Sequence, residues 1–513
     1  MQLTHALHRA AQLYPTRTAT VFRERRRSYR ESAERIARLA GCLHKLGVAK
    51  GERVSVLAVN SDHYQEIMLA CWWLGAVLNP VNTRWSAAEI AYSLDDCGAA
   101  LLLVDDHHLP LLPEILASVT QRPMLMHAGE ARAPSGTLSM ERLIESAEPV
   151  ADSRSGGEDL AVIMYTGGTT GRPKGVMLSH AALLTTVLLR LAEQAPLANL
   201  VGLNVAPLFH IAGLAAAYAR VVSGDSNVYI PGFEPVELLQ TLCREQANET
   251  LLVPTMLQAL LAHPRFAEFD LGCLQRILYG ASPISEALLE KAMDLLPQAA
   301  FMQVYGLTEN TGLVSFNPPA NHGPEARAVG LHRSVGRPMF GQWVKIIDGQ
   351  GAEVPRRAIG ELLVSGPTVM QGYWGKPEET AKVLKDGWLY TGDAAYMDED
   401  GHLFIVDRVK DMIITGGENV YSAEVENVLA THPAVALCAV IGIPHDAWGE
   451  TVHAVVMLKP GASATEEELR THCRTQIAGY KCPKSVEFRE ALPLSAAGKI
   501  LKRDLREPFW AGR

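Results

Sequence analysis

Several features that would direct a chain of 513 residues toward particular protein classes are missing here. The eight cysteines include no Cys-x-x-Cys pair, which argues against a disulfide framework or a zinc site and favours reduced thiols. No apolar run reaches the ~18 residues that a membrane-spanning helix needs. The first residues, Met1–His8, lack the basic start and apolar core of a signal peptide. We therefore expect a soluble, cytoplasmic protein without a transmembrane segment.

An excess of positive charge is also absent. The net charge of −9 and the pI near 6.0 argue against a protein that binds nucleic acid by neutralising phosphates. One local exception is Arg23-Glu-Arg-Arg-Arg27, which we interpret as a solvated turn between two early strands. The alternative is a weak peripheral contact with anionic lipid. The expected partners are small molecules, and the chain is expected to be a monomer or a homodimer.

The composition is that of a globular protein, with 48% hydrophobic and 20% charged residues. At roughly 150 residues per domain, the length predicts about three or four units. Before about residue 155 the chain alternates between strand-like and helix-like segments, which predicts a parallel sheet covered by helices. The expected strands are 53–59, 76–81 and 99–104, and the expected helices are 63–74 and 87–94.

A second α/β set is expected between residues 160 and 305, with its strands at 202–206, 227–230, 250–253, 275–279 and 301–304. Two stacked α/β sheets would place a crevice at the C-terminal ends of these strands. From about 335 to 406, short alternating strands predict a small β-rich subdomain. Within it, Asp398-Glu-Asp-Gly401 is interpreted as a hairpin turn and not as a metal site. The fold class is therefore α/β, with a large N-terminal domain (1–409) and a small α+β C-terminal domain (410–513).

The glycine-rich stretch from Tyr165 to Val176 follows an apolar run at 160–164. Glycines let backbone N–H groups approach an anion, threonine hydroxyls donate hydrogen bonds, and Lys174 adds a positive charge. We interpret the stretch as a polyphosphate-binding loop, with an ordinary glycine-rich surface turn as the alternative. Neither the G-x4-G-K-S/T loop nor the G-x-G-x-x-G turn fits, because Lys174 leads into a second expected strand at 176–178.

Four further motifs follow in order: Tyr305-Gly-Leu-Thr-Glu309, Trp388-Leu-Tyr-Thr-Gly-Asp393, Asp407–Tyr421 and Ala497-Gly-Lys-Ile500. In this order and at these separations, the chain resembles the adenylate-forming superfamily over essentially its whole length. It is most similar to the acyl-CoA synthetase, or fatty-acid–CoA ligase, branch. The resemblance implies an ATP-dependent acyl-CoA synthetase that converts a carboxylic acid to acyl-AMP, releases pyrophosphate and transfers the acyl group to CoA. The implied cofactors are ATP and Mg²⁺, with CoA as co-substrate.

The resemblance also implies roles for individual residues. The implied catalytic residues are Lys499, Thr308, Glu309 and Lys174, and the implied metal ligands are Glu309 and Thr170. Gly168 stands where the family commonly has serine, and Leu494-Ser-Ala-Ala497 departs from the usual Pro-Lys before the lysine motif. The implied ATP/AMP-binding set is Thr166, Gly167, Gly168, Thr169, Thr170, Gly171, Lys174, Gly280, Ala281, Ser282, Tyr305, Gly306, Thr308, Asp393, Arg408 and Lys499.

An acyl pocket is implied beneath the segment 204–214. Its implied lining is His210, Ile211, Gly213, Leu214, Leu257, Gly306 and Gly312, with His210 at the mouth. An apolar tunnel suits a medium- or long-chain fatty acid best and an aromatic acid next. Arg220, the only nearby fixed charge, is expected on a helix surface and not paired with a second carboxylate of the substrate.

The two half-reactions imply a mobile C-terminal domain. In the family this domain rotates after adenylation, with its hinge at the position of Lys410, and Gly416 and Gly417 then line the CoA tunnel.

Four alternative functions remain. An amino-acid-adenylating domain would need an acidic residue near position 210. An acyl-AMP ligase that loads a carrier protein usually has an insertion, and none lies between 372 and 407. A luciferase-like oxygenase shares the motifs. Against a non-catalytic nucleotide-binding paralogue stand Thr308, Glu309, Asp393, Arg408 and Lys499.

Overall fold

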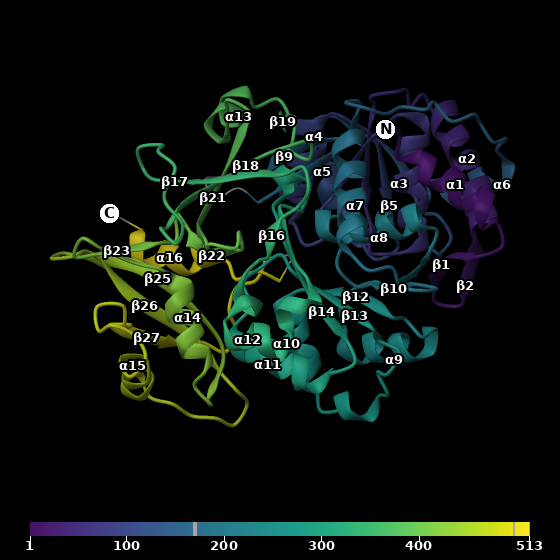
Figure 1. The fold of residues 1–513 in the computed structure, drawn as a ribbon. Coiled ribbons are helices and arrows are strands. Elements are labelled where there is room, and N and C mark those ends of the chain that lie inside the picture. Colours follow the sequence, from purple (N-terminus) through teal and green to yellow (C-terminus); the bar gives the residue numbers. More distant parts are fainter. Residues whose placement is uncertain (168–171, 496–497, 512–513) are drawn as a thin grey trace.

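The structure is a computed structural model, which describes residues 1–167, 172–495 and 498–511. Figure 1 shows a large N-terminal part on one side and a small C-terminal domain on the other. The expected α/β class, with a large domain of sheets and a smaller C-terminal domain, is confirmed. Within the described ranges, no helix is both long and apolar enough to cross a bilayer.

The first large sheet has nine strands and contains the expected second α/β set. Its central strands are parallel, and helices α8 (Ile211–Ser223), α9 (Pro235–Glu245), α10 (Pro254–Ala262) and α11 (Glu286–Leu295) accompany them. An N-terminal hairpin joins this sheet, because β1 pairs with β11. In sheet order the strands are β16 (Arg337–Pro338), β15 (Ser315–Asn317), β14 (Ala300–Tyr305), β13 (Arg276–Gly280), β12 (Glu249–Leu252), β10 (Val201–Asn204), β11 (Ser226–Tyr229), β1 (Thr18–Phe22) and β2 (Arg25–Ser28).

The second large sheet has eight strands and includes the hairpin that carries the glycine-rich stretch. Its strands are β19 (Gly372–Tyr373), β9 (Lys174–Ser179), β8 (Leu160–Thr166), β4 (Val77–Pro80), β3 (Arg53–Leu57), β5 (Ala99–Val104), β6 (Met124–His127) and β7 (Leu138–Ser139). The accompanying helices are α1 (Thr4–Leu13), α2 (Tyr29–Lys45), α3 (Asp62–Leu74), α4 (Ala87–Cys97), α5 (Leu112–Ser118), α6 (Met140–Ser146) and α7 (His180–Glu193).

The ends of these helices follow from local sequence. Side chains of Ser28 and Ser86 form capping boxes with the glutamates three residues later, which satisfies exposed N–H groups at the first turns of α2 and α4. Gly75 and Gly98 end α3 and α4 in the left-handed conformation that glycine adopts without strain.

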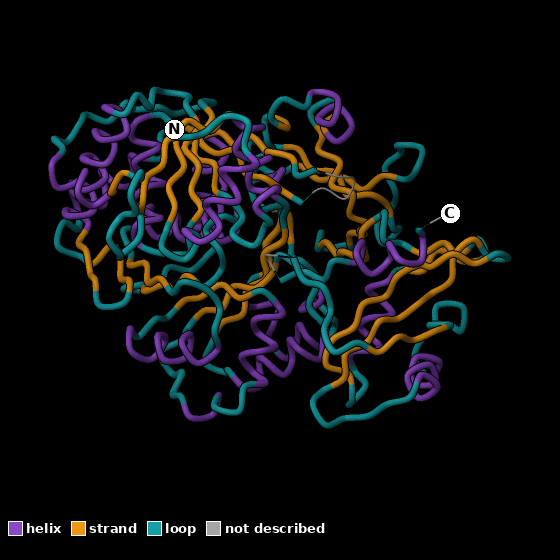
Figure 2. The backbone as a smooth tube through the Cα atoms, turned by 180° about the vertical axis from the view of Figure 1, so that it is seen from behind, coloured by secondary structure: helices purple, strands orange, loops and turns teal. Residues whose placement is uncertain are grey.

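The largest hydrophobic core joins helices of both large sheets. It contains Trp72 of α3 and Tyr218 of α8, whose rings meet edge to face at 5.2 Å. Tyr218 also donates a hydrogen bond to the carbonyl of Leu3 (2.7 Å), which attaches the amino terminus. Figure 2 shows the same arrangement from behind, with helices around and between the strands of the large part. This shared core holds the two sheets in one relative position.

Two smaller sheets complete the chain. A β-rich region comprises β17 (Trp343–Ile347), β18 (Gly360–Ser365), β20 (Leu384–Lys385), β21 (Trp388–Met397) and β22 (Leu403–Arg408), with α13 (Pro377–Val383) inserted. The C-terminal sheet comprises β23 (Ile413–Thr415), β24 (Glu418–Val420), β25 (Val435–His445), β26 (Gly449–Leu458) and β27 (Ser485–Phe488), with α14 (Ser422–Ala430), α15 (Glu466–Arg474) and α16 (Lys502–Trp510). The C-terminal part has hydrophobic clusters made only of its own residues. The boundary at 409/410 remains a prediction.

Candidate active site

The glycine-rich stretch connects two antiparallel strands. Thr166 at the end of β8 pairs with Lys174 at the start of β9, and the expected second strand at 176–178 lies within β9. The predicted ligands Gly168, Thr169, Thr170 and Gly171 lie outside the described residues, whereas Gly167 is exposed. Lys174 forms an ion pair with Glu379 of α13 at 2.6 Å. The loop is therefore attached to a strand hairpin and not to a helix.

The motif after β14 forms a tight turn with a short 3₁₀ helix, Thr308–Asn310. Gly306 is required by packing, because a Cβ there would lie 2.4 Å from the carbonyl carbon of Gly312. Gly312 itself has φ +87°. The buried side chain of Thr311 donates to the carbonyl of Thr368 at 2.5 Å, which anchors the turn. Glu309 is thereby presented from a fixed backbone.

One contact of Glu309 was missed by the sequence analysis. The Tyr373 hydroxyl donates to Glu309 Oε1 at 2.9 Å. Burial and the neighbouring Glu309 carboxylate raise the pKa of Tyr373, so the phenol stays protonated as a donor. Among the described residues, no side chain donates to Glu309 Oε2, a hard oxygen ligand that fits the predicted Mg²⁺.

The segment Gly280–Ser282 leaves the C-terminal end of β13 in an unusual backbone conformation. Gly280 has φ +152°, and a Cβ there would lie 2.1 Å from the Val304 carbonyl oxygen. Ala281 has φ +64°, which L-residues seldom adopt and which often marks functional segments. This places backbone groups at the sheet edge where α/β proteins bind nucleotides.

Asp393, Arg408 and Tyr305 form one polar cluster. Asp393 and Arg408 are cross-strand partners on β21 and β22, and Arg408 Nε lies 2.8 Å from Asp393 Oδ1. The Tyr305 hydroxyl donates to the other carboxylate oxygen at 2.5 Å. Burial alone would lower the pKa of Arg408, but Asp393 and Tyr305 raise it. Three predicted nucleotide ligands are thus brought together although the sequence separates them by 103 residues, from 305 to 408.

Lys499 belongs to the C-terminal domain and lies at its contact with the large domain. Ser495 holds it, because the Lys499 N–H donates to the Ser495 hydroxyl (3.0 Å) and Ser495 N–H donates back to the Lys499 carbonyl (2.7 Å). Thr255 of the large domain donates to the Gly498 carbonyl at 3.2 Å. Lys499 is exposed by surface area, and desolvation and Arg408 lower its pKa against the opposing effects of Asp393 and Glu309.

His210 faces the same contact. Burial and the positive charges of Lys499 and Arg84 lower the pKa of His210 to about 4, so its imidazole is neutral near pH 7. Arg84 donates to the carbonyl of Ser495 at 3.3 Å. The charges of Lys499 and Arg84 therefore reach His210, whose ring packs against Phe209 at 5.7 Å.

The other predicted acyl-pocket residues divide into two groups. Ile211 contacts the position of Gly312, and a Cβ on Gly213 would lie 2.2 Å from the Pro207 carbonyl oxygen. Leu214 and Leu257 have no exposed surface and pack in two different cores, so they support the walls without forming them. The small apolar cluster between α8 and the nine-stranded sheet was missed, although Ala212 and Ala216 have helical i, i+4 spacing. It comprises Ala206, Ala212, Ala216, Leu251, Leu278 and Val304.

The expectation for Arg220 was wrong. Its side chain is buried and pairs with Glu249 at 2.8 Å. Arg190 and Arg276 bind the same carboxylate at 3.1 and 3.0 Å. Although burial alone would raise it, the three guanidinium groups lower the pKa of Glu249 to about 2. Arg220 lies on the face of α8 that packs against the sheet, next to Gly202 of β10. Its charge is balanced by Glu249, 29 positions later in the sequence.

The basic cluster 23–27 is a turn between β1 and β2, as expected, but it is not simply solvated. Arg25 pairs with Asp62 (2.6 Å) and Glu130 (2.7 Å), and Arg26 pairs with Glu245 (2.6 Å). Arg27 also pairs with Asp62. These carboxylates balance the charges of Arg25, Arg26 and Arg27, and the membrane alternative remains a prediction.

Gly416 and Gly417 form the turn between β23 and β24, with φ +61° and +86°. Their positive φ values explain glycine without any bound pantetheine, because Cβ atoms there would meet nothing closer than 3.8 Å. Figure 1 places β23 at the edge of the small domain that faces away from the large domain. Lys410 is exposed, and the Arg506 side chain donates to its carbonyl at 3.3 Å. The tunnel and hinge roles remain predictions.

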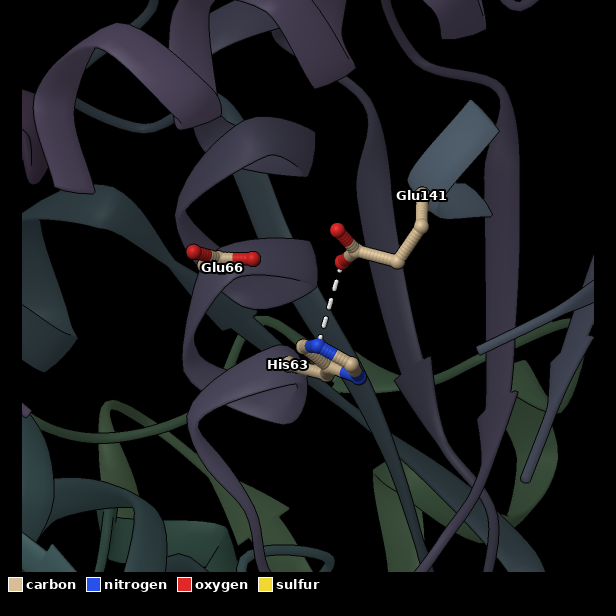
Figure 3. Close-up of side chains that lie close together, drawn as sticks. All are labelled: His63, Glu66 and Glu141. Carbon is tan, nitrogen blue, oxygen red and sulfur yellow. Dashed lines mark ion pairs between the residues drawn. The ribbon is translucent and has the colours of Figure 1, made fainter. Parts of the chain in front are cut away.

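Three groups of described side chains have donors spaced closely enough for a metal: His63–Glu66–Glu141, Glu286–Glu290–His332 and Asp398–Asp400–His402. The first is shown in Figure 3, where His63 faces Glu141 with Nε2 3.1 Å from the carboxylate. Arg35 already binds both glutamates, at 2.7 and 2.5 Å, and supplies the positive charge that a metal would bring. None of the three groups includes Glu309.

Comparison with known proteins identifies the relatives of this chain. A family model described as "AMP-binding enzyme" matches residues 7–374, and one described as "AMP-binding enzyme C-terminal domain" matches residues 424–499. The chain is 40% identical to a feruloyl-CoA synthase from Amycolatopsis over 98% of both chains. It is 37% identical to a fatty acid–[acyl-carrier-protein] ligase from Streptomyces coeruleorubidus, over 98% of this chain and 95% of that one.

A solved structure is also similar. It is o-succinylbenzoate-CoA synthetase from Bacillus subtilis with its acyl-adenylate intermediate, with a TM-score of 0.85, 30% identity and coverage of 98% and 97%. The chain therefore belongs to the AMP-binding enzyme family, and it is an AMP-forming acid–thiol ligase of the acyl-CoA ligase branch of the adenylate-forming superfamily.

Proposed function

We propose that the protein activates an aromatic carboxylic acid with ATP and transfers the aryl-acyl group to CoA. The observation that carries the reaction class is the polar cluster of Tyr305, Asp393 and Arg408, whose side chains come from three separate motifs and meet at 2.5 and 2.8 Å. The medium- or long-chain fatty acid favoured by the sequence becomes the alternative substrate.

Two observations support an aromatic acid. A feruloyl-CoA synthase is 40% identical over nearly the whole chain. The cluster between α8 and the sheet presents small alanine side chains opposite Leu278 and Val304, and Ala212 and Val304 retain exposed surface. We infer that small side chains at these positions leave more room beside α8 for a planar ring than larger side chains would.

In the first half-reaction, a carboxylate oxygen of the acid attacks the α-phosphorus of ATP, and the bond from that phosphorus to pyrophosphate breaks. Lys499 would offset the repulsion between the two anions and stabilise the charge that develops at phosphorus. Asp393 would accept hydrogen bonds from the ribose hydroxyls, and Arg408 would contact ribose or phosphate. Lys174 would neutralise charge on the departing pyrophosphate. Glu309 would hold Mg²⁺, which supplies Lewis-acid stabilisation of phosphate oxygens.

In the second half-reaction, the thiol sulfur of CoA attacks the acyl carbon and the bond to AMP breaks. The present contact places Lys499 against the large domain and the Gly416–Gly417 turn at the surface. This arrangement suits adenylation, and thioester formation would require the C-terminal domain to rotate near Lys410.

An AMP-release assay tests the function. Purified protein would receive ATP, Mg²⁺ and CoA with ferulate, benzoate, octanoate, palmitate or succinate. We expect the highest kcat/KM with an aromatic acid. Preference for octanoate or palmitate by tenfold or more would refute the aromatic assignment and support the fatty-acid alternative. No acid-dependent AMP release would refute the reaction class.

A second candidate is transfer to a carrier protein, which the 37% identical fatty acid–[acyl-carrier-protein] ligase favours. The same assay with a phosphopantetheinylated carrier protein in place of CoA distinguishes the two. Faster acyl transfer to the carrier than to CoA would support this candidate.

A further inference from the structure

Tyr373 lies between two side chains of opposite charge in the candidate site. It ends β19, which pairs with β9, so the phosphate-loop hairpin and Tyr373 share one sheet edge. Its hydroxyl donates to Glu309 at 2.9 Å, and the Lys174 ammonium lies over its ring at 5.0 Å from the centroid. Only 7% of the Tyr373 surface is exposed. A single buried side chain thus contacts both the predicted metal ligand and the predicted phosphate-binding lysine.

The position of Tyr373 is rigid. Its backbone N–H donates to the Thr380 hydroxyl at 2.9 Å, which attaches it to the first turn of α13. A Cβ on the preceding Gly372 would lie 2.9 Å from the Thr380 methyl carbon, so the two segments pack without a gap. Glu379, next to Thr380 on α13, binds Lys174 at 2.6 Å. Lys174 is therefore held by the ring face and by this carboxylate.

Opposite charges at a nucleotide site create a specific problem. Lys174 and Glu309 would attract each other in a desolvated cleft, and a direct ion pair would occupy the groups that phosphate and Mg²⁺ need. A phenol avoids this outcome, since it is neutral and can donate one hydrogen bond to a carboxylate while its ring face attracts a cation. The second carboxylate oxygen stays available for a metal.

We propose that Tyr373 is a positioning residue that orients Glu309 for Mg²⁺ and keeps it apart from Lys174, while Glu379 holds Lys174 until a phosphate replaces it. The proposal rests on the nucleotide-binding roles of Glu309 and Lys174 in the proposed function. It adds two residues, Tyr373 and Glu379, to which neither the motifs nor the family comparisons assign a role.

The first test replaces Tyr373 by phenylalanine, which keeps the ring and removes the hydroxyl. Mn²⁺ binding to the complex with a nonhydrolysable ATP analogue would be measured by EPR, with Mg²⁺-dependent pyrophosphate exchange as a second readout. Losing an outer hydrogen bond to a metal ligand typically weakens metal affinity about 10- to 100-fold. We expect that loss for Tyr373→Phe, with an equal rise in half-maximal Mg²⁺ and an unchanged rate of thioester formation from supplied acyl-AMP.

Tyr218→Phe is the matched control, because it removes a buried phenol hydrogen bond (2.7 Å to the Leu3 carbonyl) that involves neither Glu309 nor Lys174. It should alter thermal stability and leave Mn²⁺ affinity unchanged. Mn²⁺ affinity of Tyr373→Phe within twofold of wild type would overturn the positioning role. If wild type showed no acid-dependent exchange, the proposed function would fail, while the EPR comparison would still test Tyr373.

The second test replaces Glu379 by glutamine. Because the carboxylate competes with phosphate for Lys174, its removal should strengthen metal-free ATP binding several-fold at low salt. Glu378→Gln, one residue earlier on the same helix turn, is the control and should change affinity by less than twofold. Weaker or unchanged ATP binding by Glu379→Gln would refute the holding role.

Discussion

Lys499→Ala should separate the two half-reactions. The Lys499 backbone is held by Ser495, so truncating the side chain removes charge with little change in the loop. Desolvation and the charge of Arg408 lower the pKa of Lys499, although the residue keeps exposed surface. At an effective dielectric constant of about 20, a unit charge about 4 Å from an anion contributes about 4 kcal/mol. Losing one preorganised donor costs about 2.7–4 kcal/mol, or about 100- to 1000-fold in kcat.

We therefore expect acyl-AMP formation by Lys499→Ala to fall about 100- to 1000-fold in pyrophosphate exchange. Conversion of supplied acyl-AMP and CoA to thioester, followed by chromatography, should stay within threefold of wild type. Arg503→Ala removes an exposed charge from the same tail and should change neither step. Unchanged exchange by Lys499→Ala, or an equal loss in both steps, would refute the role.

The pH dependence gives an independent check. The protonated ammonium is the active form, so adenylation should decline as pH rises through the pKa of Lys499. Because that pKa is lowered, the decline should begin at a lower pH than for a lysine with an ordinary pKa. Lys499→Arg should show no such decline below pH 10, because a guanidinium stays charged. A wild-type rate that is flat to pH 10 would contradict this.

Three further predictions concern other parts of the chain. Lys410→Pro should spare pyrophosphate exchange and abolish thioester formation, because proline restricts φ at the hinge; equal losses would count against the hinge. Glu249→Gln should lower unfolding free energy by about 3–5 kcal/mol in urea denaturation, because three buried arginines lose the carboxylate that they share. In wild type, Glu249 should contribute fully to the free energy of unfolding above its unfolded pKa of about 4.3, and this contribution should be lost as pH falls toward 2. A stability that does not change with pH over this range would contradict the prediction. Gly306→Ala should reduce nucleotide affinity at least tenfold in calorimetry, since its Cβ would lie 2.4 Å from Gly312; wild-type affinity would show that the turn can adapt.

The sequence by itself determined what depends on neighbouring residues. The β8–β9 hairpin followed from an apolar run, glycines and a second strand. The five motifs identified the family because their residues are contiguous. The sequence did not indicate which sheet the β1–β2 hairpin joins. In the structure it extends the nine-stranded sheet of the second α/β set.

Only the tertiary structure decided which distant side chains meet. The sequence predicted Arg220 on the surface, but in the structure it is paired with Glu249. Arg25 was expected in a solvated turn, but it is paired with Asp62. Tyr373 lies 64 positions from Glu309, so no local pattern could connect them. The physical reason is common to all three. Periodicity and propensity act over one or two turns, whereas burial, pKa and charge pairing depend on which elements the folded sheets bring together.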